Sequence, residues 1–240
     1  MDITKLTKPA RKLLKLKKCG AVIVAAGSAS RMGGIDKILA LLDTQPVLRH
    51  TLRAFEECDA IAEVVVVTRE ELVDEVKKLS APCPKVIAVV PGGKSRQESV
   101  EKGLQKLSKD VKLAAIHDGA RPLVTWQLID RVVRAANTYG AAAPGISVKD
   151  TIKTVTGGIV VNTPDRASLQ AVQTPQVFDI DLLKGALLKA YQDDAVITDD
   201  CSAVERLGMK VKMVEGEETN LKITTPMDLK IARMLLEERK

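Results

Sequence analysis

The sequence predicts an α/β protein built on a doubly wound, Rossmann-like, mostly parallel β-sheet. Apolar runs of strand length alternate with segments of helical periodicity from residue 20 onward. These runs are continuous rather than alternating with polar residues, which is typical of strands covered by helices on both faces. Short connections and right-handed crossovers between such strands favour the doubly wound arrangement.

The elements are expected in the following order. Strands are predicted at 20–26, 64–68, 86–90, 113–117 and 140–146, and the helices between them at 46–57, 70–79, 95–107 and 125–138. Further on, strand-like segments are predicted at 171–178 and 210–214, with helices at 179–191, 199–207 and 226–239. Ligands bind such sheets beyond the carboxyl ends of the strands, so the loops at 27–37, 91–96 and 118–122 should meet in one crevice.

The alternation is interrupted once, at residues 147–163. Two β-prone runs are joined there through Thr156, Gly157 and Gly158, a pattern that predicts a β-hairpin with a glycine turn. An isolated two-stranded ribbon is marginally stable in water, so we expect this projecting arm, about 147–168, to pack on a second copy of the chain. Residues 19–240 are predicted to form a single domain, preceded by a basic extension at 1–18.

Composition indicates a water-soluble globular protein. The 240 residues are 45% hydrophobic and 28% charged. No apolar run approaches the roughly 20 residues that span a bilayer, and no secretion signal is recognised, so we expect neither a membrane span nor export. The four cysteines are widely separated and form no CxxC pair. Free, buried thiols in a reducing compartment are therefore expected, which predicts a cytoplasmic protein.

The net charge of +6 belongs to the first 18 residues. That segment holds seven basic residues and one acidic residue, and the remainder of the chain holds 30 of each. It could form an amphipathic helix that contacts membrane or RNA, but a solvated extension is favoured. Because the rest of the chain is neutral, no nucleic acid partner is expected.

Two loops resemble nucleotide-binding motifs but fail the stricter patterns. The segment Gly93-Lys94-Ser95 ends like a P-loop, yet Ala88 stands where GxxxxGK[ST] needs glycine. In the first loop only Gly27 fits a GxGxxG frame, since Ala29 and Met32 occupy the other two positions. The sequence therefore gives little support for a dinucleotide-binding site or an ATP-hydrolase site.

A phosphate-binding loop without either motif remains. Backbone amides in the small-residue loop after the first strand could bind an anion, and Arg31 and Lys37 would meet its charge. At the end of the fourth strand, Asp118 could hold Mg²⁺ directly or through water. Its alternative roles are a helix N-cap or an ion pair with Arg121.

Taken in order, these motifs resemble the 2-C-methyl-D-erythritol 4-phosphate cytidylyltransferase family. The matching segments are AAGSASRM with Lys37, PGGKSRQESV, HDGARP, VKDT, PDR, QTPQVF, ITDDCSAVE and NLKITTPMDL. The resemblance runs from about residue 20 to the C-terminus. It implies the nucleotidyltransferase version of the Rossmann-like fold, dimerisation through the arm, and a reaction that joins CTP to a polyol phosphate with Mg²⁺ or another divalent cation and releases pyrophosphate.

The resemblance also implies the site. Catalytic roles fall to Arg31, Lys37 and Lys222. Nucleotide binding falls to Ala25, Ala26, Gly27, Ser28, Gly92, Gly93, Ser99 and Asp118. Substrate binding falls to Asp118, Arg121, Thr151, Arg166, Thr174 and Thr198, with Thr151 and Arg166 reaching the neighbouring subunit. The chain departs from the family at Ala29, where a second glycine is usual, and at Ile38, where glutamine is frequent.

Two other functions are weighed against this one. A cytidylyltransferase for ribitol 5-phosphate or another polyol phosphate shares the fold, but it tends to have AGG and HDAVRP where this chain has AAG and HDGARP. A noncatalytic nucleotide-binding protein, or an RNA-binding protein directed by the tail, would consume no CTP. In the cytidylyltransferase reading no general base is needed, because a phosphate monoester with a second pKa of about 6 is already an effective nucleophile.

Overall fold

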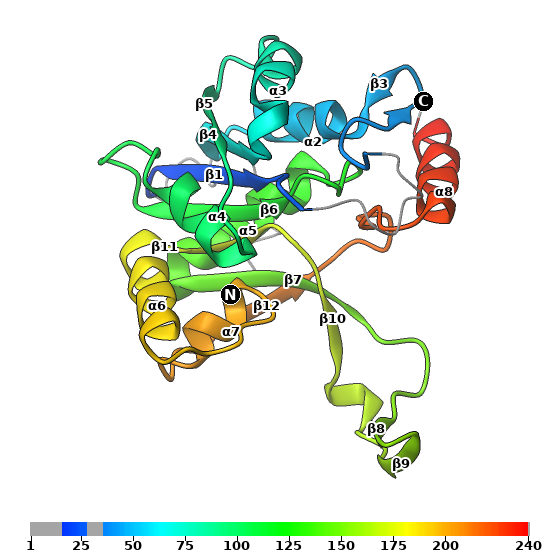
Figure 1. Cartoon of the computed structure of the whole chain (residues 1–240). Helices are drawn as coiled ribbons and strands as arrows, with labels where there is room; N and C mark the ends of the chain where they lie inside the picture. Colours follow the sequence, from blue (N-terminus) through cyan, green and yellow to red (C-terminus); the bar gives the residue numbers. More distant parts are fainter. Residues whose placement is uncertain (1–15, 28–35, 240) are drawn as a thin grey trace.

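The computed structural model describes residues 16–27 and 36–239, and within them an eight-stranded mixed sheet forms the centre of the fold (Figure 1). The strand order is β10-β7-β11-β6-β1-β4-β5, with β12 paired to β7. Four neighbouring strands are mutually parallel: β6 (Leu113–Asp118), β1 (Cys19–Val24), β4 (Ile61–Thr68) and β5 (Val86–Pro91). The mostly parallel sheet predicted from the sequence is confirmed.

The second half of the sheet is mixed. Antiparallel pairing joins β11 (Gln176–Asp179) to both β6 and β7 (Ala141–Ser147). At the edges of β7, β12 (Lys212–Glu215) pairs in parallel and β10 (Gln170–Val172) pairs antiparallel. The single strand predicted at 171–178 is therefore wrong: β10 and β11 are separate strands. Gln173 still donates its backbone N–H to Pro144 at 2.8 Å, but Pro175 has no N–H for a ladder bond.

Helices cover both faces of the sheet. Successive strand residues point to opposite faces, so Ala21 and Ile23 join one core and Val22 joins the other. The first core includes α2 (Val47–Glu56), α3 (Val73–Ser80) and α5 (Trp126–Tyr139). The second includes α4 (Arg96–Leu104), α6 (Ile180–Gln192) and α7 (Asp200–Glu205). Burial of aliphatic side chains on both faces is the main stabilising term of this fold.

Smaller elements differ from the predicted pattern. A 3₁₀ turn, η2 (Glu70–Leu72), precedes α3, and α4 ends three residues before its expected limit. The two-residue strands β2 (Leu41–Leu42) and β3 (Gln45–Pro46) were not predicted, because periodicity cannot be read from two residues. They pack with the C-terminal helix α8 (Pro226–Glu237) in a third small core beside the sheet.

A hairpin extends away from the sheet between β7 and β10 (Figure 1). It consists of β8 (Thr154–Thr156) and β9 (Ile159–Asn162), which pair antiparallel. Gly157 and Gly158 form its turn at φ values of 57° and 81°, where glycine is favoured over residues with a side chain. The turn η3 (Arg166–Ser168) then leads back to β10. The role of this arm in dimerisation stays a prediction.

The expectation of free, buried cysteines is confirmed. All four thiols are buried and none is in a disulfide, and burial raises the pKa of Cys58 to about 11. No helix in the part of the chain that the structure describes has the length and hydropathy needed to cross a membrane. The predictions for the basic tail lie outside the described residues up to residue 15. Of its last residues, Lys17 pairs with Asp179, and Lys18 pairs with Asp110.

Candidate active site

A pocket of about 350 Å³ lies at the carboxyl ends of β1 and β6, beside the glycine loop that follows β5. The three loops at 27–37, 91–96 and 118–122 each contribute to its wall, as expected for a doubly wound sheet. Its size is in the usual range for small-molecule sites. The lining residues are Val24, Ala25, Ala26, Gly27, Lys37, Ile38, Gly93, Lys94, Ser95, Arg96, Ser99, Asp118, Ala120 and Lys222.

The described part of the first loop supplies small residues and the cation Lys37. Ala25 and Ala26 continue from β1, and the backbone N–H of Ala25 donates to Val67. The ammonium of Lys37 lies close to Gly27, since a Cβ built on this glycine would be 3.5 Å from Nζ. Backbone and cation thus share one end of the pocket. Ser28 and Arg31, two of the predicted site residues, lie outside the described residues.

The glycine loop before α4 is held close to the first loop. A Cβ on Gly92 would stand 2.6 Å from the Cβ of Ala26, and one on Gly93 would stand 2.3 Å from the Cβ of Glu98. Only glycine fits both positions without displacing a neighbour. The hydroxyl of Ser99 accepts from the N–H of Gly93 at 3.1 Å, which fixes the loop against the helix. Gly92 supports the wall rather than lining it.

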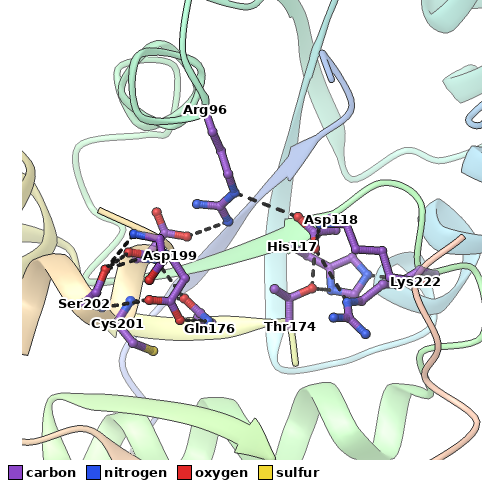
Figure 2. A network of polar contacts seen from close by, with 12 residues as sticks. Arg96, His117, Asp118, Thr174, Gln176, Asp199, Cys201, Ser202 and Lys222 are labelled. Atoms are coloured by element: carbon purple, nitrogen blue, oxygen red, sulfur yellow. Dashed lines mark hydrogen bonds and ion pairs between the residues drawn. The ribbon is translucent and has the colours of Figure 1, made fainter. Parts of the chain in front are cut away.

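Asp118 forms the floor of the pocket, and three cationic side chains surround its carboxylate. Two of them, Arg96 and Lys222, are labelled in Figure 2. Lys222 Nζ lies 2.8 Å from Oδ2, Arg121 Nε 3.6 Å from Oδ2, and Arg96 Nε 3.9 Å from Oδ1. Burial opposes ionisation, but Lys222, and then Arg96 and Arg121, outweigh it and hold the pKa of Asp118 at about 2. The carboxylate is therefore charged at neutral pH. Of its two alternative roles, the ion pair with Arg121 is present.

Thr174 and His117 support this floor from below. The hydroxyl of Thr174 accepts from the backbone N–H of Asp118 at 3.1 Å and contacts His117 Nδ1 at 3.0 Å. His117 is completely buried, and this burial lowers its pKa to about 3. A neutral imidazole behind the carboxylate has a structural role here, which agrees with chemistry that needs no histidine base.

Arg96 connects the pocket to a second buried carboxylate, and the sequence did not single out this role. Its Nη2 lies 2.7 Å from Oδ2 of Asp200, a residue with no exposed surface. Burial raises the pKa of Asp200 although Arg96 opposes the shift. Gln176 accepts from the backbone N–H of Asp200 at 3.1 Å. Arg96 and Asp200 both stand in motifs that carried the resemblance, but nothing in the spacing of these motifs indicated that the two side chains would pair.

Comparison with known proteins identifies the family. The family model for 2-C-methyl-D-erythritol 4-phosphate cytidylyltransferase (IspD) matches residues 19–238. The enzyme of that name from Caldanaerobacter subterraneus subsp. tengcongensis is 44% identical over 221 residues, covering 90% of this chain and 97% of the relative. The chain belongs to this family.

The same cytidylyltransferase family appears among further sequences and solved structures. The enzyme from Desulforamulus reducens is 45% identical over 224 residues, which cover 91% of this chain and 96% of that one. The crystal structure of 4-diphosphocytidyl-2C-methyl-D-erythritol synthase from Anaerococcus prevotii superposes with a TM-score of 0.83 at 31% identity, covering 92% and 99% of the two chains. The crystal structure of the cytidylyltransferase from Thermus thermophilus gives a TM-score of 0.75 at 33% identity over 90% and 98%.

Within one chain of this cytidylyltransferase, the predicted substrate residues fall into three places. Asp118, Arg121 and Thr174 meet at the pocket floor. Thr198 lines a neighbouring cavity of about 220 Å³ that shares Ser95 and Arg96 with the pocket. Thr151 and Arg166 are exposed on the arm and line neither cavity. Thr174 lines neither cavity, and the assignment of Thr174 and Thr198 to one substrate site stays a prediction.

Arg121 connects the loop after β6 to the segment that carries Lys222. Its Nη1 donates to the backbone carbonyl of Asn220 at 2.6 Å, and burial lowers its pKa. Nearby, the backbone N–H of Ile223 donates to Ala120 at 2.8 Å. These bonds join the loop after β6 to the segment that carries Lys222, although 99 positions separate Arg121 from Asn220 along the chain.

Proposed function

We propose that this protein is a cytidylyltransferase that joins CTP to 2-C-methyl-D-erythritol 4-phosphate and releases pyrophosphate, a step of isoprenoid precursor synthesis. The family membership supports this activity, and the observation that carries it in the structure is the pocket itself. There, a glycine loop, the cations Lys37 and Lys222 and the carboxylate of Asp118 converge at the carboxyl ends of parallel strands. This is the arrangement that phosphoryl transfer between two anions requires.

The chain's residues act mainly by positioning and by offsetting charge. An oxygen of the substrate phosphate attacks the α-phosphorus of CTP; a new P–O bond forms, and the bond to the bridging oxygen breaks as pyrophosphate leaves. No proton has to be removed from the nucleophile. In our proposal Lys37 and Lys222, with Arg31, stabilise negative charge on the transferring phosphoryl group. Ala25, Ala26, Gly27 and Ser28 bind the triphosphate, and the glycine loop with Ser99 binds the base.

The donor set of the pocket fits a divalent cation held mainly by the nucleotide. Among the described residues no cluster of three or more potential ligands exists, and Asp118 is the one acidic side chain lining the pocket. Mg²⁺ usually binds through one or two carboxylates together with substrate phosphates. Asp118 would hold it directly or through water, and Mg²⁺ would neutralise phosphate charge when bound.

We propose that the active form is a homodimer in which the arm completes the substrate site of the neighbouring subunit. The arm carries Thr151 and Arg166 far from its own pocket, and four of its valine and isoleucine side chains are more than half exposed. Apolar patches of this kind mark interaction surfaces. The free, buried cysteines support a reducing, cytoplasmic location.

Pyrophosphate release tests the proposal. Each nucleoside triphosphate is assayed with and without 2-C-methyl-D-erythritol 4-phosphate, and ribitol 5-phosphate serves as the matched alternative. We expect release only with CTP and the erythritol phosphate, and loss of release when EDTA removes the divalent cation. Turnover that prefers ribitol 5-phosphate would assign the alternative substrate, and no release with any pair would refute the activity.

A further inference from the structure

The segment that carries Lys222 has no regular secondary structure of its own. Residues 217–224 connect β12 to α8 without forming a helix or a strand. The ammonium of Lys222 nevertheless lies 2.8 Å from Asp118, at the floor of the pocket. A long, flexible side chain on an irregular segment needs an external support if it is to stay in one place. The support comes from a residue two positions earlier.

Asn220 is that support, and it is completely buried. Its side-chain Nδ2 donates to the backbone carbonyl of Thr174 at 2.9 Å and to Oε1 of Gln173 at 3.2 Å. Its backbone carbonyl accepts from Arg121 Nη1 at 2.6 Å. Both partners of Nδ2 are acceptors, so the amide orientation is determined by the hydrogen bonds.

Gln173 closes the same network from the sheet side. Its Nε2 donates to the carbonyl of Glu217 at 2.8 Å, and its Oε1 accepts from the N–H of Glu217 at 3.3 Å. One buried glutamine thus pairs with the backbone of the Lys222 segment much as a strand would. The next residue, Thr174, accepts from the N–H of Asp118. Gln173 and Asn220 therefore connect Thr174 to the segment that carries Lys222, and Thr174 and Lys222 both contact Asp118.

The network contains one costly feature. Oδ1 of Asn220 is buried and has no hydrogen-bond partner among the described residues. A buried acceptor without a partner destabilises a fold, but an apolar residue here would also remove the donor to the carbonyl of Thr174. The two donors of the amide therefore provide something that packing alone does not.

We propose that Asn220 is a positioning residue for nucleotidyl transfer, which holds Lys222 and Thr174 in register around Asp118. This inference rests on the proposed function, because the role of Lys222 in the transfer comes from there. Asn220 has no exposed surface and is not among the residues lining the pocket, so it acts through Lys222. A displacement of about 1 Å at such a group can cost on the order of 10²-fold in rate.

The test is a double-mutant cycle on kcat in the full-length protein. Asn220→Ala, Lys222→Ala and the double variant are assayed with CTP and 2-C-methyl-D-erythritol 4-phosphate. We expect Asn220→Ala to lower kcat about 10²-fold in the wild-type background. In the Lys222→Ala background it should lower kcat less than about threefold, because residues that act through one another are not additive. An equal loss in both backgrounds would show a merely structural role and overturn the proposal.

Two further variants keep the test decisive. Asn220→Ser removes the amide without adding a buried charge and keeps a hydroxyl donor, so it should show the same non-additivity if Asn220→Ala fails to fold. Ser80→Ala, the matched control, removes a buried hydrogen bond to Val76 on α3 and should lower Tm without changing kcat. An inactive wild type would refute the proposed function and the inference with it. An active wild type with unimpaired Asn220 variants would refute the positioning role alone.

Discussion

The pocket floor and the hairpin arm both carry residues that the family resemblance assigns to the substrate, yet they are constructed in opposite ways. At the floor, Asp118 is buried and in contact with three cationic side chains, of which Arg96 and Lys222 come from distant parts of the chain. On the arm, the guanidinium of Arg166 bonds to the carbonyl of Lys149 at 2.7 Å, and every residue of β9 is exposed.

This difference distinguishes the pocket floor, which one chain orders by itself, from the hairpin arm, which it supports less. The floor's geometry is determined by strands, a buried threonine and a buried asparagine, so it is organised before a ligand arrives. Preorganised charge is the largest contribution to catalysis in sites of this kind. The arm is less supported within the described part of its own chain, where Lys149 pairs with Glu218, because a two-stranded ribbon buries too little surface to be rigid. In the proposed dimer, the neighbouring subunit orders Thr151 and Arg166.

The largest expected effect is at the floor. Lys222→Ala should lower kcat by about 10²–10³-fold, because it removes one preorganised cation from the site of charge development. The thermal unfolding midpoint should change little, since the side chain is partly exposed. Steady-state kinetics and a melting curve measure the two quantities. A near-normal kcat in Lys222→Ala would contradict a catalytic role for Lys222 at the pocket floor.

The arm can be tested by complementation. Arg166→Ala and Lys37→Ala should each be nearly inactive alone, and an equal mixture should recover roughly a quarter of wild-type activity if random heterodimers each regain one intact site. The mixture is assayed after co-expression, with Lys37→Ala plus Lys222→Ala as control. Lys37 and Lys222 line the same pocket. If each pocket is built mainly on one chain, the control mixture should recover far less than a quarter of wild-type activity. Absence of recovery in the first mixture would place Arg166 within its own subunit's site.

The exposed apolar surface of the arm gives a smaller, physical effect. Val160→Asp should weaken self-association, because a charge replaces a half-exposed apolar side chain on a surface that needs covering. Sedimentation velocity at several concentrations measures this. Leu188→Asp on α6, an equally exposed apolar position away from the arm, is the matched control. If Val160→Asp and Leu188→Asp change self-association equally, the result would contradict a dimer formed through the arm.

The smallest expected effect is the pH dependence of stability at the floor. The pKa of His117 in the folded chain is about 3, below its ordinary value of 6.5, because the ring is buried. The unfolded chain therefore binds the proton first, so this contribution is fully present above pH 6.5 and is lost as pH falls towards 3. Denaturant unfolding at about pH 7.5, 6 and 5 should show stability declining, and His117→Gln should decline less. The arm variant Arg166→Ala should decline like the wild type.

Much of the fold could be predicted from local pattern. The four parallel strands were recognised because each is a short, continuous aliphatic run between helical segments, and the hairpin turn because two consecutive glycines interrupt two β-prone runs. The carboxyl-end rule then placed the loops at 27–37, 91–96 and 118–122 in one crevice. All of these signals lie within a few residues of the feature that they predict.

The sequence by itself determined the fold class, the place of the pocket and the family, together with the two cations Lys37 and Lys222. Only the tertiary structure decided the long-range pairs of the site: Arg96 with Asp200, Asn220 with Thr174, and Arg96 and Lys222 with Asp118. The physical reason is that periodicity and motif spacing report neighbours along the chain, whereas these contacts join residues far apart in the sequence through the order of strands in the sheet. That order, with the packing of side chains on it, sets which charges meet.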